Sequence, residues 1–460
     1  MGNKWNTVRL GDYCIKIGSG ATPKGGNSVY TDTGNTYFIR SQNVYNDGFN
    51  TNGLVFITDE AALKLKNVDV QENDILLNIT GDSVARVCIA PRAFLPARVN
   101  QHVAIIRPKN DAFDPRFLRY FLSSPHQQAL LLTLASAGAT RNALTKGMIE
   151  ELQVPKPHVH TQISIANVLE SFDKKIESNN KINQTLGKMS QTLFKSWFVD
   201  FDPVIDNALD AGNSIPEALQ SRAELRQKVR NSTDFKPLPA NIRALFPAEF
   251  EETELGWIPK DWSIENFSEI AQLVKENVKS EDTSTYVHYV GLEHLERKHI
   301  FITNYGNGSD VSSNKTAFSK DDLLFGKLRP YFHKVAITPF SGICSTDILV
   351  FRAKKKYYKS LMAMYAFTDE FVAYANLRST GTRMPRAEAK DLLKYKIVLP
   401  NENILEKFEL LLNDYWSKGQ LNNNESKQLT VLRDTLLPKL ISGELSLEDL
   451  PDLIKQTEAA

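Results

Sequence analysis

Cysteine is scarce in this chain, which contains only Cys14, Cys88 and Cys344 among 460 residues. The three are odd in number, far apart in the sequence, and without the paired spacing of a zinc site, so neither a disulfide framework nor a structural metal is indicated. The eight histidines also lack cysteine or carboxylate neighbours at metal-ligand spacing. We therefore expect a cytoplasmic protein that binds no metal.

Long apolar runs are absent as well. The chain has no stretch of 18 apolar residues, which excludes a hydrophobic membrane-spanning helix. Residues 1–6 contain no apolar signal region, and position 6 is Asn rather than the Ser or Thr that N-myristoylation favours. The sequence predicts neither secretion nor a membrane partner.

Catalytic signatures are also missing. Gly-x-Gly triplets, such as residues 18–20, lack the third glycine of a dinucleotide loop, and neither a Gly-Lys-Ser/Thr phosphate loop nor an Asn/Asp-Pro-Pro-Tyr/Phe methyltransferase motif occurs. Asp369, Glu388 and Lys390 follow the order of nuclease active-site residues. However, residues 385–393 have the pattern of a helix start, whereas that chemistry needs carboxylates at adjoining strand ends. We expect a non-catalytic chain without a cofactor of its own.

The net charge of +1 is small, but charge alternates along the chain. Residues 1–158 contain 17 Lys and Arg against 13 Asp and Glu, and residues 257–400 contain 21 against 16. Residues 159–256 contain 11 against 14, and residues 401–460 contain 6 against 11. Two mildly basic segments thus alternate with two acidic ones, which favours DNA contact by the basic segments.

The most informative feature is a long helical pattern that occurs twice, about 244 residues apart. Alternating spacings of four and three residues define one seam in each copy, apolar at both ends and polar in the middle. A single copy would be interpreted as an ordinary core helix, whereas two copies favour pairing with each other. The first seam contains Ile165, Leu169, Phe172, Ile176, Asn179, Asn183, Leu186 and Leu193; the second contains Ile404, Phe408, Leu411, Tyr415, Leu429, Leu432 and Leu436.

Asparagines at seam positions can fix the register of paired helices at some cost in stability. The hypothesis is that Asn179 and Asn183 set this alignment. On that reasoning, replacing both by Leu would raise thermal stability and leave the pair free to slip.

The two basic segments share the order of their strand and turn signals. Asp74-Ile75-Leu76-Leu77 corresponds to Asp322-Leu323-Leu324-Phe325, and Leu152-Gln153-Val154-Pro155 to Ile397-Val398-Leu399-Pro400. A helix is predicted over residues 115–134, with Asp114 as its N-cap and Pro115 at its first position. The first copy is about 15 residues longer, mostly before Asp74.

These patterns predict an α+β fold with two mixed α/β domains, a pair of long antiparallel coiled-coil helices that separates them, and a pseudo-twofold internal repeat. The expected segments are a mixed domain at 1–158, a long helix at 159–200, a Pro-rich acidic connector at 201–256, a second mixed domain at 257–400, a second long helix at 401–445 and an acidic tail at 446–460.

Reading duplex DNA requires planar or bidentate donors at base edges and cations on phosphates. Polar side chains of this kind concentrate in the predicted turns of both basic segments, although an ordinary solvated residue is the alternative at each position. The candidates are Arg40, Gln42, Asn43, Thr80, Ser83, Arg86, Arg98, Gln101, Thr140, Arg141 and Asn142 in the first segment, and Lys327, Arg329, Lys334, Arg378, Thr382 and Arg383 in the second. Residues 140–141 and 382–383 match, whereas Gln42-Asn43 has no evident twin near Gly291-Leu292-Glu293.

The connector contains Phe198-Val199-Asp200-Phe201-Asp202-Pro203-Val204 and Glu254-Leu255-Gly256-Trp257-Ile258-Pro259, and the second helical pattern ends in Thr435-Leu436-Leu437-Pro438-Lys439-Leu440-Ile441-Ser442-Gly443-Glu444-Leu445. With the repeated domains and helices, these stretches resemble the specificity subunit of type I restriction-modification systems over almost the whole chain.

The resemblance implies that each mixed domain is a target-recognition domain for one half of a bipartite double-stranded DNA site. The helices would set the gap and dock two methyltransferase subunits, which a restriction and motor subunit joins in host defence. S-adenosylmethionine, ATP and Mg²⁺ are then expected on the partner subunits only. The alternatives are a non-catalytic coiled-coil scaffold and a stand-alone DNA nuclease or methyltransferase.

Overall fold

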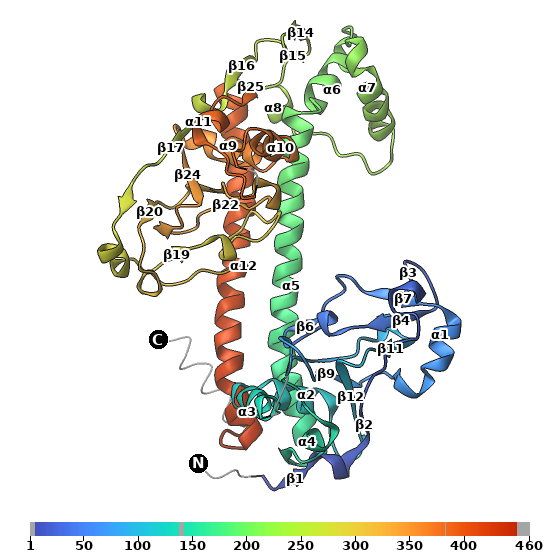
Figure 1. Ribbon diagram of the computed structural model, residues 1–460. Helices are drawn as coiled ribbons and strands as arrows, with labels where there is room; N and C mark the ends of the chain where they lie inside the picture. Colours follow the sequence, from blue (N-terminus) through green and yellow to red (C-terminus); the bar gives the residue numbers. More distant parts are fainter. Residues whose placement is uncertain (1–4, 138–141, 382, 449–460) are drawn as a thin grey trace. The chain divides into compact units, whose positions relative to one another are not determined.

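The computed structural model describes residues 5–137, 142–381 and 383–448. It contains two compact units. Unit 1 comprises the chain up to Glu177 together with the chain from Ser426 onward, and unit 2 comprises Ser178–Glu425. The chain has two long helices, α5 (Val159–Phe198) and α12 (Glu402–Ser442) (Figure 1). Each of them is divided between the units, with one end in unit 1 and the other in unit 2.

Unit 1 contains two main sheets. The first is antiparallel, in the order β10-β9-β12-β2, and the second, in the order β3-β7-β4-β11-β8, has one parallel pair, β4 with β11. Two short pairs, β1 with β13 and β5 with β6, complete its strands. The bounds are β1 Thr7–Arg9, β2 Cys14–Ser19, β3 Tyr30–Thr31, β4 Thr36–Ile39, β5 Val44–Tyr45, β6 Gly48–Phe49, β7 Val55–Ile57, β8 Asp69–Val70, β9 Ile75–Asn78, β10 Val87–Ile89, β11 Ala97–Val99, β12 Val103–Pro108, β13 Gln153–Pro155, α1 Asp59–Lys64, α2 Pro115–Ser123, α3 Pro125–Ser136 and α4 Lys146–Glu150.

Unit 2 has a corresponding antiparallel sheet, β17-β24-β21-β22, and a second sheet, β18-β20-β23-β19, in which β19 and β23 are parallel. The bounds are β14 Phe250–Thr253, β15 Gly256–Pro259, β16 Ser263–Asn266, β17 Ala271–Leu273, β18 Asn277–Val278, β19 Tyr289–Val290, β20 Lys315–Phe318, β21 Leu323–Gly326, β22 Val335–Ile337, β23 Gly342–Cys344, β24 Ile348–Ala353, β25 Lys396–Leu399, α6 Asp202–Ala211, α7 Glu217–Arg230, α8 Ala240–Arg243, α9 Lys359–Ala366, α10 Asp369–Leu377 and α11 Ala389–Leu392.

The internal repeat extends to buried side chains. Asp74 precedes β9 and accepts two hydrogen bonds from Arg107, at 2.6 and 2.7 Å. Asp322 precedes β21 and accepts two from Arg352, both at 2.8 Å. Hydrogen bonding to the buried carboxylate raises the pKa of each guanidinium. The same ion pair at the same place in both sheets confirms the predicted repeat of a mixed fold.

The predicted helix over residues 115–134 is wrong in one respect. Asp114 does cap it, since its side chain accepts hydrogen bonds from the backbone N–H groups of Arg116 and Phe117. However, α2 ends at Ser123 and α3 starts at Pro125, because proline has no N–H and disfavours the helical conformation of the residue before it. Ser124 is accordingly extended, with φ −63° and ψ 146°.

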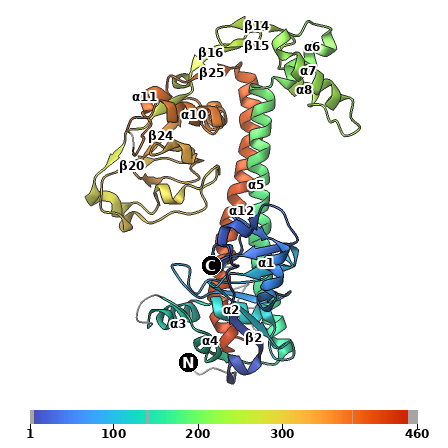
Figure 2. The ribbon, with the colours of Figure 1, turned by 45° about the vertical axis from the view of Figure 1, so that its right-hand side comes forward.

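The helices α5 and α12 lie side by side (Figure 2), and a layer of buried amides joins them within unit 2. Asn183 Nδ2 donates to Asn423 Oδ1 at 2.6 Å and to Gly419 O at 3.1 Å, and Asn422 Nδ2 donates back to Asn183 Oδ1 at 2.9 Å. Asn179 Nδ2 donates to Glu425 Oε2 at 2.9 Å. The polar gap in the second seam is therefore filled by Asn422 and Glu425, which lie at the seam spacing between Tyr415 and Leu429, and by the adjacent Asn423.

The remaining seam positions lie buried or half-buried on both helices. Next to the amide layer, Trp416 Nε1 donates to Ser190 Oγ at 3.2 Å. Gly419 is needed there because a Cβ at this position would lie 2.6 Å from the buried ring of Phe301. The loop that contains Phe301 thus packs directly on α12.

Each mixed domain is attached to a long helix through buried or half-buried polar groups. In unit 1, Asp173 of α5 accepts hydrogen bonds from Tyr120 of α2 at 2.6 Å and from Arg433 of α12 at 2.7 Å. In unit 2, Glu409 of α12 accepts one from the backbone N–H of Ser360 at 2.9 Å and forms an ion pair with Lys359 at 3.1 Å. These contacts fix α2 in unit 1 and α9 in unit 2 against the long helices.

The sequence predicted that replacing the seam asparagines by leucine would raise thermal stability, but the paired amides lead to the opposite expectation. Asn183→Leu should lower the free energy of unfolding by about 2–4 kcal/mol, because it leaves the amides of Asn422 and Asn423 buried without partners. Adding Asn422→Leu and Asn423→Leu should recover much of the loss. Thermal and denaturant unfolding of both variants would test this, and an increased Tm for Asn183→Leu alone would contradict it.

Candidate nucleic-acid interface

Four segments converge at one edge of unit 1, here called the first loop edge: residues 40–43, 79–86, 100–102 and 142–144. The backbone N–H of Ile79 donates to His102 O at 2.9 Å, and that of Leu144 donates to Ile79 O at 2.8 Å. Asn78 Nδ2 donates to Ser41 O at 2.9 Å. The main chain therefore brings together polar loops that are far apart in the sequence.

Unit 2 repeats this arrangement at a second loop edge, made of residues 291–294, 327–334, 345–347, 380–381 and 383–387. The backbone N–H of Lys327 donates to Asp347 O at 2.9 Å, and that of Ala387 donates to Lys327 O at 3.0 Å. Lys334 Nζ donates to Leu292 O at 2.5 Å. The two edges thus share one backbone frame and differ in their side chains.

The loop with Gln42 and Asn43 does have a twin, contrary to the sequence comparison. Asn43 Oδ1 accepts the backbone N–H of Arg40 at 3.0 Å, and in unit 2 His294 Nδ1 accepts that of Gly291 at 2.9 Å. Both turns follow the strand that pairs in parallel with β11 or β23. The correspondence is hidden in the sequence because a histidine replaces the asparagine as the acceptor.

Most of the predicted contact residues remain accessible at the two edges. Arg86 lies over the ring of Tyr45 at 4.5 Å, and Arg378, beside the second edge, lies over Tyr374 at 5.5 Å, so both guanidinium groups are held by an aromatic face. Thr80 Oγ1 lies 2.5 Å from His102 Nδ1. Gln42, Gln101, Asn142, Arg378 and Arg383 are exposed, and Arg40, Thr80, Ser83, Arg86, Lys327, Arg329 and Lys334 are half-buried.

Two predicted contacts are corrected by the structure. Asn43 is fully buried, and its amide donates to Asn50 O at 2.8 Å, so it stabilises the loop from within. Arg98 forms an ion pair with Asp69 at 2.6 Å and donates to Ala62 O at 3.2 Å. Both side chains are committed to internal bonds, because the strand and turn that contain them are packed inside the domain.

Thr140, Arg141 and Thr382 lie outside the described residues. Sequence reasoning missed Arg386, an exposed residue of the second loop edge whose Nε donates to Asp347 Oδ1 at 3.2 Å. The available signal was its position three residues after Arg383, in the same short loop.

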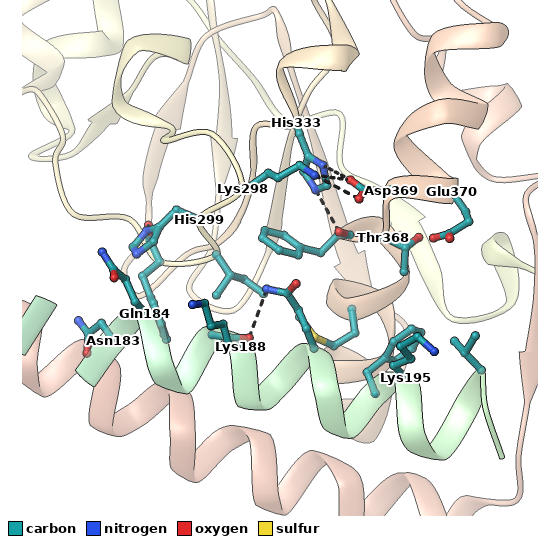
Figure 3. Close-up of a pocket in the computed structure, with 18 residues that line it drawn as sticks. Asn183, Gln184, Lys188, Lys195, Lys298, His299, His333, Thr368, Asp369 and Glu370 are labelled. Atoms are coloured by element: carbon teal, nitrogen blue, oxygen red, sulfur yellow. Dashed lines mark hydrogen bonds and ion pairs between the residues drawn. The ribbon is translucent and has the colours of Figure 1, made fainter. Parts of the chain in front are cut away.

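Unit 2 also contains a cavity of about 490 Å³ beside α5, lined by apolar side chains and by lysines such as Lys188 (Figure 3). At its wall, Asp369 forms an ion pair with Lys298 at 2.8 Å, and Asp369 Oδ1 lies 3.2 Å from His333 Nδ1. The bond from Lys298 lowers the pKa of Asp369, and burial lowers the pKa of His333. Asp369 starts α10 and Glu388 precedes α11, so the nuclease-like order is not placed at adjoining strand ends.

Other reactive groups are not gathered into a site within the described part of the chain. There, no three His, Cys, Asp or Glu side chains lie close enough together to hold a metal ion. Burial raises the pKa of the Cys88 and Cys344 thiols to about 12, which keeps both unreactive at neutral pH. No helix in the described ranges is long and apolar enough to cross a membrane.

The internal role of Asn43 leads to a stability prediction. Asn43→Ala should lower the free energy of unfolding by about 1–3 kcal/mol, because it removes the acceptor of the Arg40 N–H and the donor to Asn50 O. The neighbouring exposed Gln42→Ala is the matched control and should change it by less than about 0.5 kcal/mol. Equal stabilities in denaturant unfolding would show that the Asn43 bonds contribute nothing.

Comparison with known proteins shows which proteins this chain resembles. Residues 2–188 match the type I restriction modification DNA specificity domain. The type I restriction enzyme HindI specificity subunit of Haemophilus influenzae is 25% identical over 75% of this chain and 81% of its own length. The MjaIX specificity subunit of Methanocaldococcus jannaschii is 24% identical over 85% and 82%.

Among solved structures, the S subunit of a type I restriction-modification system from M. genitalium has the same fold, with a TM-score of 0.53 at 16% identity, over 95% of this chain and 96% of that one. The matched domain, the relatives aligned along most of the chain and the common fold agree with one another. Residues 2–188 thus match the specificity domain of type I restriction-modification systems, and most of the chain is similar to the specificity subunits of such systems.

Proposed function

We propose that the chain confers sequence specificity on a type I restriction-modification complex, with each loop edge contacting one half of a bipartite double-stranded DNA site. The observation that carries the proposal is the shared backbone frame of the two edges. The backbone groups of Lys327 and Lys334 make the same hydrogen bonds in unit 2 that those of Ile79 and Arg86 make in unit 1. One frame with different exposed side chains is what two different half-sites require, because base edges are recognised by side-chain chemistry.

The long helices supply the spacer in this proposal. They contain 40 and 41 residues, so each extends roughly 60 Å at ~1.5 Å per residue. That length corresponds to on the order of 18 base pairs at ~3.4 Å per base pair. Two contacted half-sites separated by an uncontacted gap follow from it.

In this proposal, partner subunits carry out DNA methylation and cleavage. Two methyltransferase subunits would dock on the long helices and hold S-adenosylmethionine, and a restriction and motor subunit would supply ATP- and Mg²⁺-dependent cleavage. The chain itself then acts in the bacterial or archaeal cytoplasm as a non-catalytic subunit. This assignment is supported by the similarity to type I specificity subunits, and by the contacts of Asp369 with Lys298 and His333.

Exchanging one mixed domain tests the modular assignment. Replacing residues 1–158 by those of a relative should change one half of the methylated motif and leave the other half unchanged, because each loop edge is built within its own unit. Methylome sequencing of a host with the assembled complex measures both halves at once. The reciprocal exchange of residues 257–400 is the control, and a change in both halves would contradict the proposal.

Lengthening the spacer tests its role in setting the gap. Because Asn179 bonds to Glu425, a heptad added to α5 between Ser178 and Asn179 needs a matching heptad in α12 directly after Glu425 to keep the amide layer paired. The double insertion should widen the gap by about three base pairs, since seven residues add roughly 10.5 Å. The contacted bases should stay the same, and an unchanged gap would exclude the spacer role.

A single insertion in α5 is the control. It shifts one side of the amide layer past the other, so we expect a lower Tm rather than a new gap.

A further inference from the structure

The loop between β21 and β22 of unit 2 exposes two neighbouring aromatic rings. Tyr331 is 45% exposed and Phe332 is 39% exposed, and their ring centroids lie 4.8 Å apart. Neither residue was selected from the sequence. An aromatic pair this accessible at the tip of a loop adds little to the core and is available for contact with another molecule.

The corresponding loop of unit 1, residues 79–86, has the same length and backbone as residues 327–334. Gly81 and Ala85 have positive φ values of 77° and 73°, and Arg329 and His333 have 51° at the matching positions. Both loops close the same turn: the N–H of Val84 donates to Gly81 O at 3.1 Å, and that of Phe332 to Arg329 O at 3.0 Å. Tyr331 and Phe332 therefore occupy the places of Ser83 and Val84.

The aromatic loop keeps this conformation at a cost. Left-handed backbone is unfavourable for residues with a Cβ, and the unit 2 loop has Arg329 at the position where unit 1 has Gly81. Val84 is buried in unit 1, whereas the matching Phe332 is partly exposed. The unit 2 loop thus keeps the same backbone conformation although its large side chains, Tyr331 and Phe332, lie outside the core.

Several bonds fix the aromatic loop in place. His333 is buried, its Nε2 donates to Phe367 O at 3.0 Å, and its Nδ1 lies 3.2 Å from Asp369 Oδ1 (Figure 3). The N–H of Arg329 donates to Pro385 O at 2.7 Å, and that of Lys298 donates to His333 O at 2.9 Å. The two rings are consequently presented on a preorganised support.

Cationic side chains occur in the loop that contains the two rings and in the segment bonded to it. Lys327, Arg329 and Lys334 belong to the same loop, and the segment bonded to Arg329 contains exposed Arg383 and Arg386. Aromatic faces stack on bases, and neighbouring cations neutralise phosphates, so this combination is typical of nucleic-acid contact with unstacked bases. A purely apolar protein partner would leave this positive charge unmatched.

We propose that Tyr331 and Phe332 form an aromatic wedge that inserts at a base step of the half-site contacted by unit 2 and unstacks it. The proposal rests on the proposed function, since it needs the second loop edge to face DNA. Apolar side chains inserted between base pairs kink duplexes in this way. Unit 1 has Ser83 and Val84 at the same places, so only one half-site would be deformed.

The test uses the full specificity and methyltransferase complex with duplexes that contain 2-aminopurine at successive positions of each half-site. Binding should raise fluorescence at a step of the second half-site. Tyr331→Ser with Phe332→Val, which installs the residues of the unit 1 loop on its own backbone, should abolish that rise and weaken binding about tenfold. Signal from a target base flipped for methylation should be the same in both proteins.

Arg329→Gly is the matched control, because it places glycine at a left-handed position and removes a cation while keeping both rings. It should reduce the salt dependence of binding and preserve the fluorescence rise. Equal fluorescence and equal affinity for the double variant and the unmodified complex would overturn the wedge. Loss of methyltransferase association with unchanged DNA affinity would assign the rings to a protein contact instead. Absence of salt-dependent binding by the unmodified complex would overturn the proposed function itself.

Discussion

The buried amide layer between α5 and α12 is the constraint on which the spacer depends. Apolar seams tolerate sliding, because one leucine packs in place of another, whereas an amide must meet a donor or acceptor at one position. Asn183 satisfies this from both sides by donating to Asn423 and accepting from Asn422. A shift by one turn would break both bonds in a region closed to water.

The layer also connects to the mixed domain of unit 2. Gly419, whose carbonyl accepts from Asn183, leaves the space that Phe301 fills on α12. One short stretch of α12 thus aligns the two helices and contacts the loop that contains Phe301. The same loop contains Lys298, whose N–H donates to His333 O in the aromatic loop. Under the proposed function, spacing and recognition are mechanically linked at this point.

Recognition surfaces must vary while their support stays constant, and the two units show how that separation is achieved. The support consists of backbone bonds and buried ion pairs, such as Asp74 with Arg107 and Asp322 with Arg352. Removing one member of such a pair is costly, because the other remains charged in the interior. Exposed side chains on the loops carry no such penalty, so Ser83 and Tyr331 can occupy one backbone position.

The sequence by itself determined the two long helices, the repeated order of strands and the resemblance to type I specificity subunits, because periodicity, turn residues and the connector motifs are local signals. It could not separate Asn43 and Arg98 from true surface residues, since their bonds to Asn50 and Asp69 join distant segments. It also missed Asn422, Asn423 and Gly419, because a polar residue or glycine at or beside a seam position gives no local signal of what it contacts on the other helix.

Only the tertiary structure showed that loops of equal length share a left-handed backbone frame, and hence that Tyr331 and Phe332 replace Ser83 and Val84. The physical reason is that a polar or aromatic residue has the same identity whether it is buried or exposed. Its role is decided by the donors, acceptors and apolar surface that long-range folding places around it.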